Sequence, residues 1–158
     1  MTQAPLPEIR PTRADDLAGL EAVVAQTKLF PPEMLAGMVD EPPAPGDPAP
    51  IWLTALEGCT PVGLCFARAE TFTTGTWNLL AMAVAPARQG RGIGTALLCS
   101  LERRLKADGA RILIIDTMGT EAFTATRAFY LGCGYVQEAV LRDFWDEGAD
   151  KVTFWKKL

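Results

Sequence analysis

The chain has 158 residues, of which 49% are hydrophobic and 22% are charged, a balance typical of a globular protein. It contains no histidine, which excludes Ser-His and Cys-His nucleophile pairs, histidine-ligated zinc and an imidazole proton shuttle. The net charge of −4 argues against non-specific binding to nucleic acid, because such binding depends on Lys and Arg side chains that neutralise phosphates.

No charge-rich or Gly/Ser-rich segment divides the sequence, so we expect a single domain over residues 1–158, with its core in about 8–158. No apolar run approaches the roughly 20 residues that cross a membrane, and the first residues lack the apolar segment of a secretion signal. The four cysteines are widely spaced and form no Cys-x-x-Cys pair. These features predict a cytoplasmic protein without a membrane or nucleic-acid partner.

The first fifty residues predict two helices and a loop. Thr12 stands where an N-cap would, ahead of two acidic residues, and apolar residues recur at helical spacing over residues 17–24. Two prolines at 31–32 mark the start of a second, short helix. Segment 42–50 is too rich in proline for a helix or a central strand, so we expect a loop that forms a lid or rim.

The rest of the chain alternates between strand-like and helix-like patterns. The apolar period becomes helical from Ile93 to the glycine at 109, and residues 111–116 are apolar on both faces, as in a buried strand. Strand 76–85, this helix and strand 111–116 predict a right-handed βαβ unit with its two strands parallel. Further strands are expected at 51–56, 61–69, 135–141 and 151–158, and a further helix at 123–132.

The segment ARQGRGIGTALL, residues 87–98, places glycines at positions 90, 92 and 94, directly before the predicted helix. A helix N-terminus presents unpaired N–H groups and partial positive charge, so these glycines would let an anion approach the amides. The loop lacks the lysine of a Walker loop, and it lacks the spacing and chain position of a dinucleotide fingerprint. Close packing of the helix on the sheet is the alternative reason for such glycines.

Two segments resemble the GCN5-related N-acetyltransferase (GNAT) family. VAPARQGRGIGTALL, residues 84–98, is similar to the family's Arg/Gln-x-x-Gly-x-Gly/Ala signature between a strand and an amphipathic helix. TRAFYLGCGY, residues 126–135, is similar to its Ala-x-x-Phe/Leu-Tyr-x-x-x-Gly-Phe/Tyr segment. The resemblance covers residues 9–158. It implies an α/β fold with a mixed sheet of about six to seven strands, a splayed parallel pair and about four helices, and it implies acetyl-CoA as co-substrate without a metal.

The resemblance also implies how acetyl-CoA would bind. The backbone of Val84 would pair with the pantetheine arm, and an amide near Met82 to Val84 would stabilise the oxyanion. Arg88 and Arg91 would meet phosphate charge or lie as solvated surface side chains. The pyrophosphate would be held by backbone amides and the Thr95 hydroxyl, from these residues: Gln89, Gly90, Arg91, Gly92, Ile93, Gly94 and Thr95.

The catalytic groups are expected on the later part of the chain. Tyr130 matches the general-acid tyrosine of the family, with packing of its ring in the core as the alternative, and Tyr135 matches an aromatic core residue. Many family members carry a glutamate on the strand before the glycine loop, but segment 77–84 has no acidic residue. Glu121 is therefore our first candidate for the base and Asp116 our second, directly or through water, with a surface position as the alternative for each.

The acceptor is expected to be a primary amine of a small molecule or peptide, attacked directly in a ternary complex by an enzyme of bacterial small-molecule type. Segment 142–151, with Trp145, and the proline-rich loop would line the acceptor side. Polyamine, amino acid, antibiotic and protein terminus all stay open as acceptors. A non-catalytic acyl-CoA-binding sensor and a nucleotide-binding or redox domain are the competing functions. Exposed end strands would allow a homodimer.

Overall fold

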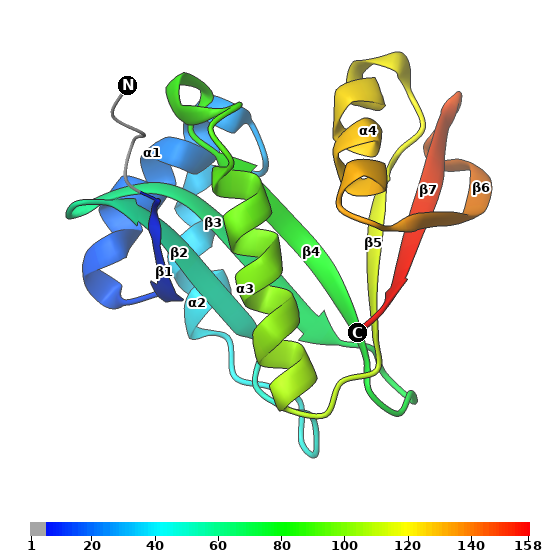
Figure 1. The fold of residues 1–158 in the computed structure, drawn as a ribbon, viewed down its shortest axis with the longest axis horizontal. Helices are drawn as coiled ribbons and strands as arrows, with labels where there is room; N and C mark the ends of the chain where they lie inside the picture. Colours follow the sequence, from blue (N-terminus) through cyan, green and yellow to red (C-terminus); the bar gives the residue numbers. More distant parts are fainter. Residues whose placement is uncertain (1–5) are drawn as a thin grey trace.

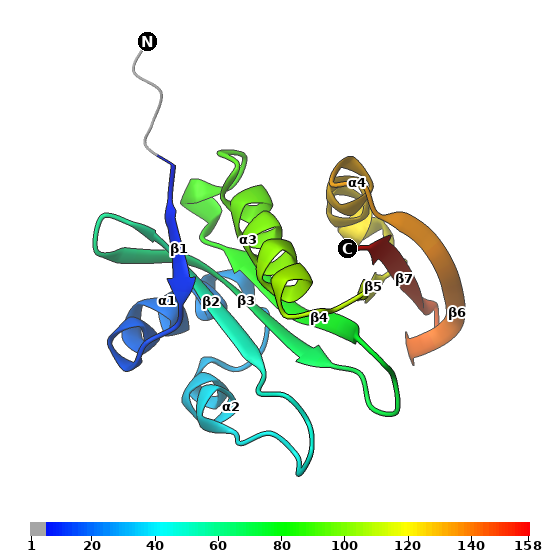
Figure 2. The same ribbon diagram turned by 60° about the horizontal axis from the view of Figure 1, so that its bottom comes forward.

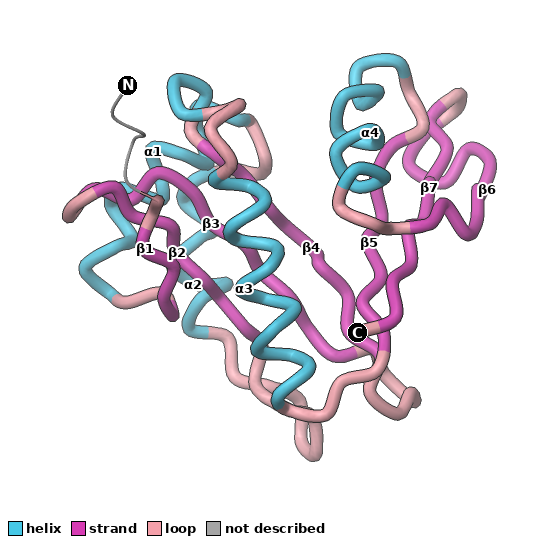
Figure 3. Tube along the Cα trace, viewed as in Figure 1, coloured by secondary structure: helices cyan, strands magenta, loops and turns pink. Residues whose placement is uncertain are grey.

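The computed structural model describes residues 6–158 as one seven-stranded sheet with four α-helices, joined by short 3₁₀ turns and loops (Figure 3). The strands are β1 (Glu8–Pro11), β2 (Ile51–Glu57), β3 (Thr60–Ala69), β4 (Thr76–Val84), β5 (Ile112–Met118), β6 (Val136–Asp146) and β7 (Ala149–Lys157). The helices are α1 (Leu17–Thr27), α2 (Leu35–Asp40), α3 (Ile93–Ala107) and α4 (Thr124–Gly132). The predicted mixed α/β class is confirmed.

The strands follow the order β1-β2-β3-β4-β5-β7-β6 across the sheet. β4 and β5 run parallel, and every other neighbouring pair in this sheet runs antiparallel. α3 connects the two parallel strands (Figure 1), because parallel neighbours need a long crossover whereas antiparallel neighbours can be joined by a short turn. The predicted unit of strand, glycine loop, helix and buried strand is therefore confirmed.

The parallel strands β4 and β5 separate partway along their length. They share four residue pairs, the last between Leu79 and Ile115. Neighbouring residues of β3 lie opposite Leu79 and Ala81, so Leu80 between them is an extra residue that bulges from β4. A bulge bends its strand, and Figure 1 shows β4 and β5 moving apart from the end near the C-terminus. The sheet is thus open at the carboxyl ends of its two parallel strands.

Helices cover both faces of the sheet, and each face has its own apolar core. α3 and α4 lie on one face, where Leu97 and Leu101 of α3 pack with Phe154 of β7. α1 and α2 lie on the opposite face (Figure 2), where Leu20 and Leu35 pack against strands β2 to β4. Because side chains alternate between the two faces of a strand, burial on both faces explains the long apolar runs of β2 and β3.

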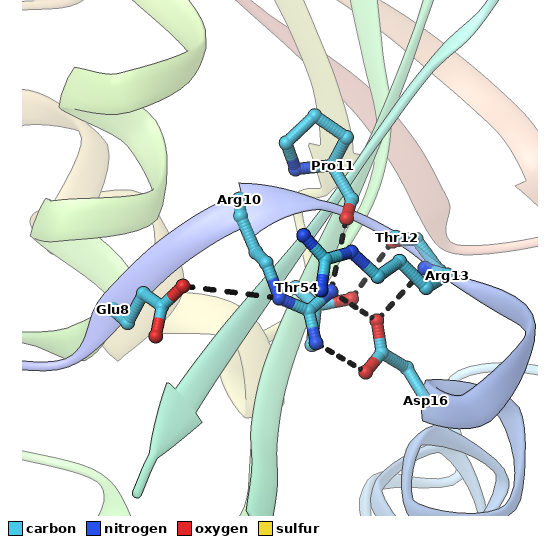
Figure 4. A network of polar contacts seen from close by, with 7 residues as sticks. All are labelled: Glu8, Arg10, Pro11, Thr12, Arg13, Asp16 and Thr54. Carbon is cyan, nitrogen blue, oxygen red and sulfur yellow. Dashed lines mark hydrogen bonds and ion pairs between the residues drawn. The ribbon is translucent and has the colours of Figure 1, made fainter. Parts of the chain in front are cut away.

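The start of α1 differs from the prediction for Thr12. A 3₁₀ turn over Ala14–Asp16 precedes the helix. The N-cap of this turn is Arg13, whose backbone N–H donates to the carboxylate of Asp16 at 2.8 Å (Figure 4). Thr12 instead shares a hydroxyl hydrogen bond of 2.8 Å with Thr54 of β2, so its prediction as N-cap was wrong. Arg10 of β1 donates two hydrogen bonds, at 2.7 and 2.8 Å, to the buried Asp16. Asp16 therefore joins the helix start to the sheet.

The last hairpin is longer than predicted. β6 continues past Leu141, where we expected this strand to end, to Asp146, which lies opposite Ala149 of β7. The pairing is irregular between Leu141 and Asp146, and Asp143 has a φ of +52°. This irregularity interrupts the alternation of side chains that would have indicated a strand.

Three other sequence features have simple counterparts in the structure. Segment 42–50 forms a loop without helix or strand, as predicted. The four cysteines are free thiols. Within residues 6–158, no helix has the length and apolar character needed to span a membrane.

Candidate functional site

A cavity of about 750 Å³ lies where β4 and β5 diverge. Its lining residues come from α1 and the turn after it, β4, the glycine loop, α3, α4 and the turn before α4: Thr27, Leu29, Met82, Ala83, Val84, Arg88, Gln89, Gly90, Gly92, Ile93, Gly94, Thr95, Phe123, Ala125, Thr126, Phe129 and Tyr130. Thr27 belongs to a helix on one face of the sheet, and Tyr130 belongs to a helix on the other. The cavity therefore passes through the gap between the strands and gives access from both faces.

The glycines of the loop differ in backbone conformation and in surroundings. Gly90 and Gly92 have φ values of +74° and +83°, and a Cβ added at either would meet no atom within 4 Å. These two glycines are favoured by their left-handed backbone conformation and not by close packing, because the space beside each of them is open. A Cβ at Gly94 would lie 3.4 Å from the ring of Phe129, at van der Waals contact, so α4 packs against α3 at this third glycine.

Backbone donors at the start of α3 face this open space. Gly92 is the N-cap of this 15-residue helix, and the first helical hydrogen bond runs from the N–H of Ala96 to the carbonyl of Gly92 at 2.9 Å. The N–H groups of Ile93, Gly94 and Thr95 therefore have no carbonyl within the helix to bind. These three residues line the cavity. Aligned N–H groups at the positive end of a helix form an anion site.

The two arginines of the loop differ in their surroundings. Arg88 lines the cavity, and its guanidinium lies 2.8 Å from the carboxylate of Glu57. Arg91 is exposed and is not among the lining residues. A contact with phosphate stays a prediction for both side chains, and Arg88 is the one positioned at the cavity wall.

The free edge of β4 supplies further backbone groups to the cavity. The N–H of Ala85 donates to the carbonyl of Val62 in β3 at 2.8 Å. Successive residues of a strand direct their polar groups to opposite sides, so the N–H and carbonyl of Val84 face the gap, as do those of Met82. The carbonyl of Val84 accepts a hydrogen bond from the side chain of Gln89 at 3.0 Å. The edge is oriented as an added strand would require.

Tyr130 is one of the residues that line the cavity. Its side chain is buried, with 6% of its surface exposed, and three rings surround it at centroid distances of 5.3, 6.1 and 5.7 Å: Phe129, Tyr135 and Phe154. Burial raises the pKa of Tyr130 well above its ordinary value of 10, and nearby thiols raise that pKa further. The phenol is therefore protonated at neutral pH and can donate a proton.

None of the described residues that line this cavity is acidic. Glu121 is exposed at the start of the turn before α4 and lies outside the lining set, although its neighbour Phe123 belongs to it. Asp116 is half-buried on β5 and accepts hydrogen bonds from Thr153 and Asn78. The cavity thus combines ten of the twelve predicted site residues, without Arg91 and Glu121.

Sequence reasoning missed the contribution of α1. Thr27 and Leu29 line the cavity, and the turn between them has Lys28 in the left-handed conformation with a φ of +53°. The helical period of α1 predicted the helix but carried no information about which strand its C-terminal end approaches. Tyr135, predicted as a core residue, is buried and donates a hydrogen bond to Glu102 at 2.7 Å.

A second cavity, of about 590 Å³, lies at the opposite end of the sheet. It is lined by the proline-rich loop, the turn between β3 and β4 and the C-terminal end of α3, including Gly75 and Asp108. The proline-rich loop, which we expected on the acceptor side, lies here instead, and none of the other predicted site residues lines this cavity. The larger cavity, next to the start of α3, is therefore the candidate functional site.

Comparisons with known proteins agree with this geometry. The model of the family described as "Acetyltransferase (GNAT) family" matches residues 23–135. A protein from Desulfovibrio desulfuricans assigned to the GNAT acetyltransferases is 29% identical with a TM-score of 0.86, over 96% of this chain and 98% of that one. No curated protein matches the sequence significantly.

Two more distant structures share the fold. An aminoglycoside 6'-N-acetyltransferase in complex with coenzyme A is 20% identical with a TM-score of 0.77, over 95% of this chain and 96% of that one. The ribosomal-protein-S18-alanine N-acetyltransferase of Escherichia coli is 18% identical with a TM-score of 0.77, over 96% of this chain and 94% of that one. The family match spans most of the sequence, and the fold has the family's parallel strand pair. The chain belongs to the GNAT family of acetyltransferases.

Proposed function

We propose that this protein is an acetyl-CoA-dependent N-acetyltransferase that acetylates a primary amine of a small molecule or peptide. The observation that carries the proposal is the single cavity that joins the free N–H groups at the start of α3 to the buried phenol of Tyr130. One end suits a diphosphate and the other suits a leaving thiolate. A domain spanning residues 8–158 is part of this proposal, because one sheet runs through those residues.

The cavity fits coenzyme A at two points. Its pyrophosphate would accept hydrogen bonds from the amides of residues 89–95, where the open space beside Gly90 and Gly92 leaves room for it. The pantetheine arm would extend along β4 and pair with the polar groups of Val84 that face the gap. The coenzyme A complex of the aminoglycoside 6'-N-acetyltransferase, which shares the fold, supports this placement.

The transfer requires an amine, an oxyanion site and an acid. The neutral amine attacks the thioester carbonyl in a ternary complex, and a backbone N–H near Met82 to Val84 stabilises the oxyanion that forms. As the carbon–sulfur bond breaks, Tyr130 donates its proton to the departing thiolate and regains a proton from water before the next turnover. The proton released by the amine passes to water, with Glu121 as the proposed final acceptor, because that exposed carboxylate lies two residues from Phe123 in the cavity wall.

The acceptor would enter from the face of the sheet that carries α1. Acetyl-CoA would occupy the side of α3 and α4, so the opening beside Thr27 and Leu29 is the remaining route to the thioester. Two proteins with this fold are named for amine acceptors, an aminoglycoside and the alanine of a ribosomal protein. Their acceptors differ in size but share an amino group, which supports an amine as the acceptor class here.

The test is an incubation of the protein with acetyl-CoA and a pooled set of amines, in which free thiol is followed over time. We expect thiol release that depends on both the protein and an amine. Reactions without amine measure the background hydrolysis of the thioester. Tight binding of acetyl-CoA without thiol release from any amine would reject catalysis.

One observation favours a second candidate function, a non-catalytic sensor of acyl-CoA. The described residues that line the cavity include no carboxylate, so no acidic side chain is in place there to accept a proton from the amine. A sensor needs the coenzyme A site alone and would keep the glycine loop. The thiol measurement separates the two functions, because both predict binding and the enzyme alone predicts turnover.

We also propose a homodimer through β6. This edge strand is exposed along its whole length, with Val140 48% exposed. A two-fold axis through Val140 would bring the bulged segment with Glu138 of one copy toward the irregular segment with Arg142 of the second copy, so opposite charges would meet across the axis. Pairing would also satisfy the free polar groups of the strand edge.

A further inference from the structure

Asp116 lies at the mouth of the gap on the α1 side of the sheet. Its neighbour Ile115 packs into the core beneath α3 and α4, and alternation along the strand places the side chain of Asp116 on the opposite face. Ile115 is also the last residue of β5 that pairs with β4. The carboxylate therefore stands where the strands part, on the face from which the proposed acceptor would enter.

Two neutral donors fix the orientation of this carboxylate. The hydroxyl of Thr153, directly opposite on β7, donates to one oxygen at 2.6 Å. The side-chain amide of Asn78 donates to the other oxygen at 3.3 Å and to the carboxylate of Glu70 at 2.8 Å. Both donors are neutral, so neither supplies a positive charge to balance the carboxylates.

Asn78 itself is incompletely satisfied. Its side chain is 6% exposed, and its Oδ1 is buried without a hydrogen-bond partner among the described residues. A buried polar atom without a partner destabilises the folded state by roughly 1–3 kcal/mol. A residue that only supported the sheet would gain from replacement by an apolar side chain. The arrangement is explained if the amide is present to hold the two carboxylates for a ligand.

An ammonium group already occupies this place. The Nζ of Lys151 lies 3.8 Å from an oxygen of Asp116 and 4.1 Å from the centre of the Phe144 ring. A carboxylate and an aromatic face are the two groups that recognise an alkylammonium ion. The distance to the carboxylate is longer than a hydrogen bond, and the lysine side chain is 23% exposed. Lys151 is therefore a weakly held occupant that another ammonium ion can displace.

We propose that Asp116 and Phe144 bind a second ammonium group of the acceptor, and that Lys151 occupies this position when no acceptor is bound. The inference rests on the proposed function and names its substrate class, the aliphatic diamines and polyamines. Asp116 and Leu80 each follow the last residue pair between β5 and β4. Met82 lies two residues further along β4, which corresponds to a distance of about 7 Å along the strand. An amine at the thioester and a second one at Asp116 are then joined by a short aliphatic chain.

The test compares cadaverine, a five-carbon diamine, with pentylamine, which has the same chain and one amino group. We expect the wild type to acetylate cadaverine with a kcat/KM about tenfold higher. Asp116→Asn should lower this preference about tenfold by raising the KM for cadaverine. Glu147→Gln, in the exposed turn between β6 and β7, removes one negative charge nearby and should keep the preference.

A second variant and a second readout make the test independent of turnover. Lys151→Met removes the internal ammonium, so calorimetry on the protein loaded with coenzyme A should show tighter binding of cadaverine, by several fold. Asp116→Asn should weaken the same binding. These variants act in opposite directions, so a general loss of folding cannot imitate both results, and thermal melts verify that each is folded.

Equal use of the two amines by the wild type, or an unchanged preference in Asp116→Asn, would overturn the inference while leaving acetyl transfer intact. So would cadaverine binding that neither substitution alters. Failure of the proposed function has a different signature, because then no amine in the pooled set releases thiol, whereas calorimetry still reports on the ammonium site.

Discussion

The side chain of Gln89 donates a hydrogen bond of 3.0 Å to the backbone carbonyl of Val84. This bond joins the glycine loop to the strand edge that faces the gap. The proposed diphosphate site and the proposed pantetheine edge are thus held in one geometry before any ligand binds. Such preorganisation lowers the cost of binding, because the loop loses less freedom when it meets the anion.

Gly92→Asp should abolish binding of coenzyme A. The substitution adds a negative charge and a side chain where the amides of α3 would meet the diphosphate, and the positive φ makes the loop less stable by roughly 1 kcal/mol. Gly46→Asp is the matched control, because Gly46 has a φ of +88° with no atom within 4 Å of an added Cβ and lies in the proline-rich loop. Calorimetry with coenzyme A measures both variants, and undiminished affinity in Gly92→Asp would reject this placement of the pyrophosphate.

Tyr130→Phe should lower turnover and leave the affinity for coenzyme A nearly unchanged. The substitution removes the proton donor and keeps the ring that packs among three other aromatic side chains. Loss of a general acid typically reduces a rate by about 100-fold or more. Steady-state thiol release across a range of pH is the measurement. A rate equal to that of the wild type at every pH would remove Tyr130 from the mechanism.

Asp16→Asn should destabilise the fold at neutral pH, because it leaves the cation of Arg10 without its buried partner. The two hydrogen bonds from Arg10 are the largest cause that holds the pKa of Asp16 below its ordinary value of 3.8. The stabilisation is therefore complete above that value and is lost as the pH falls through the lower pKa of the folded state. We expect a loss of roughly 1–3 kcal/mol at neutral pH, shrinking as the pH falls below the ordinary carboxyl pKa of 3.8.

Urea unfolding at neutral pH and at a pH below 3.8 measures the difference in the free energy of unfolding between Asp16→Asn and the wild type. The control is Glu41→Gln, which breaks the ion pair between Glu41 and Arg68, whose side chains are 55% and 41% exposed. That exposed pair should contribute less than about 1 kcal/mol. An Asp16→Asn variant as stable as the wild type at neutral pH would show that the network of Figure 4 does not stabilise the fold.

Arg142→Glu should dissociate the proposed dimer, because it places like charges opposite each other across the two-fold axis at Val140. The double variant Glu138→Arg with Arg142→Glu restores opposite charges and should dimerise again. Sedimentation of the wild type and both variants at one concentration tests this. A wild type that is a monomer, or a single variant that dimerises equally well, would reject pairing through β6.

The sequence predicted the parts of the fold that depend on local pattern. The period of α3, the apolar run of β5 and the glycines between β4 and α3 each have a direct physical cause, and together they predicted the parallel strand pair. The cap before α1 was misplaced because Thr12 followed by acidic residues is the usual pattern of an N-cap. In the structure Thr12 bonds Thr54 of β2, and Asp16 accepts hydrogen bonds from Arg13 and from Arg10 of β1. The bonds with Thr54 and Arg10 are tertiary contacts that no local pattern specifies.

The residues of the candidate site also fall into those that a local sequence pattern predicted and those that it did not. The residues of the glycine loop are contiguous in sequence, so one motif was enough to predict them. The α1 side of the cavity could not be predicted, because Thr27 and Leu29 reach the cavity through tertiary packing across the sheet. The side chains around Asp116 come from β4, β5, β6 and β7, and their meeting depends on strand order, which no local pattern specifies.

A crystal structure of the protein with coenzyme A would show whether the cavity between β4 and β5 is the binding site for acetyl-CoA. We expect the diphosphate on the N–H groups of Ile93, Gly94 and Thr95, the pantetheine paired with Val84 and the sulfur next to the hydroxyl of Tyr130. Coenzyme A bound elsewhere on the protein, with this cavity left unfilled, would contradict this expectation.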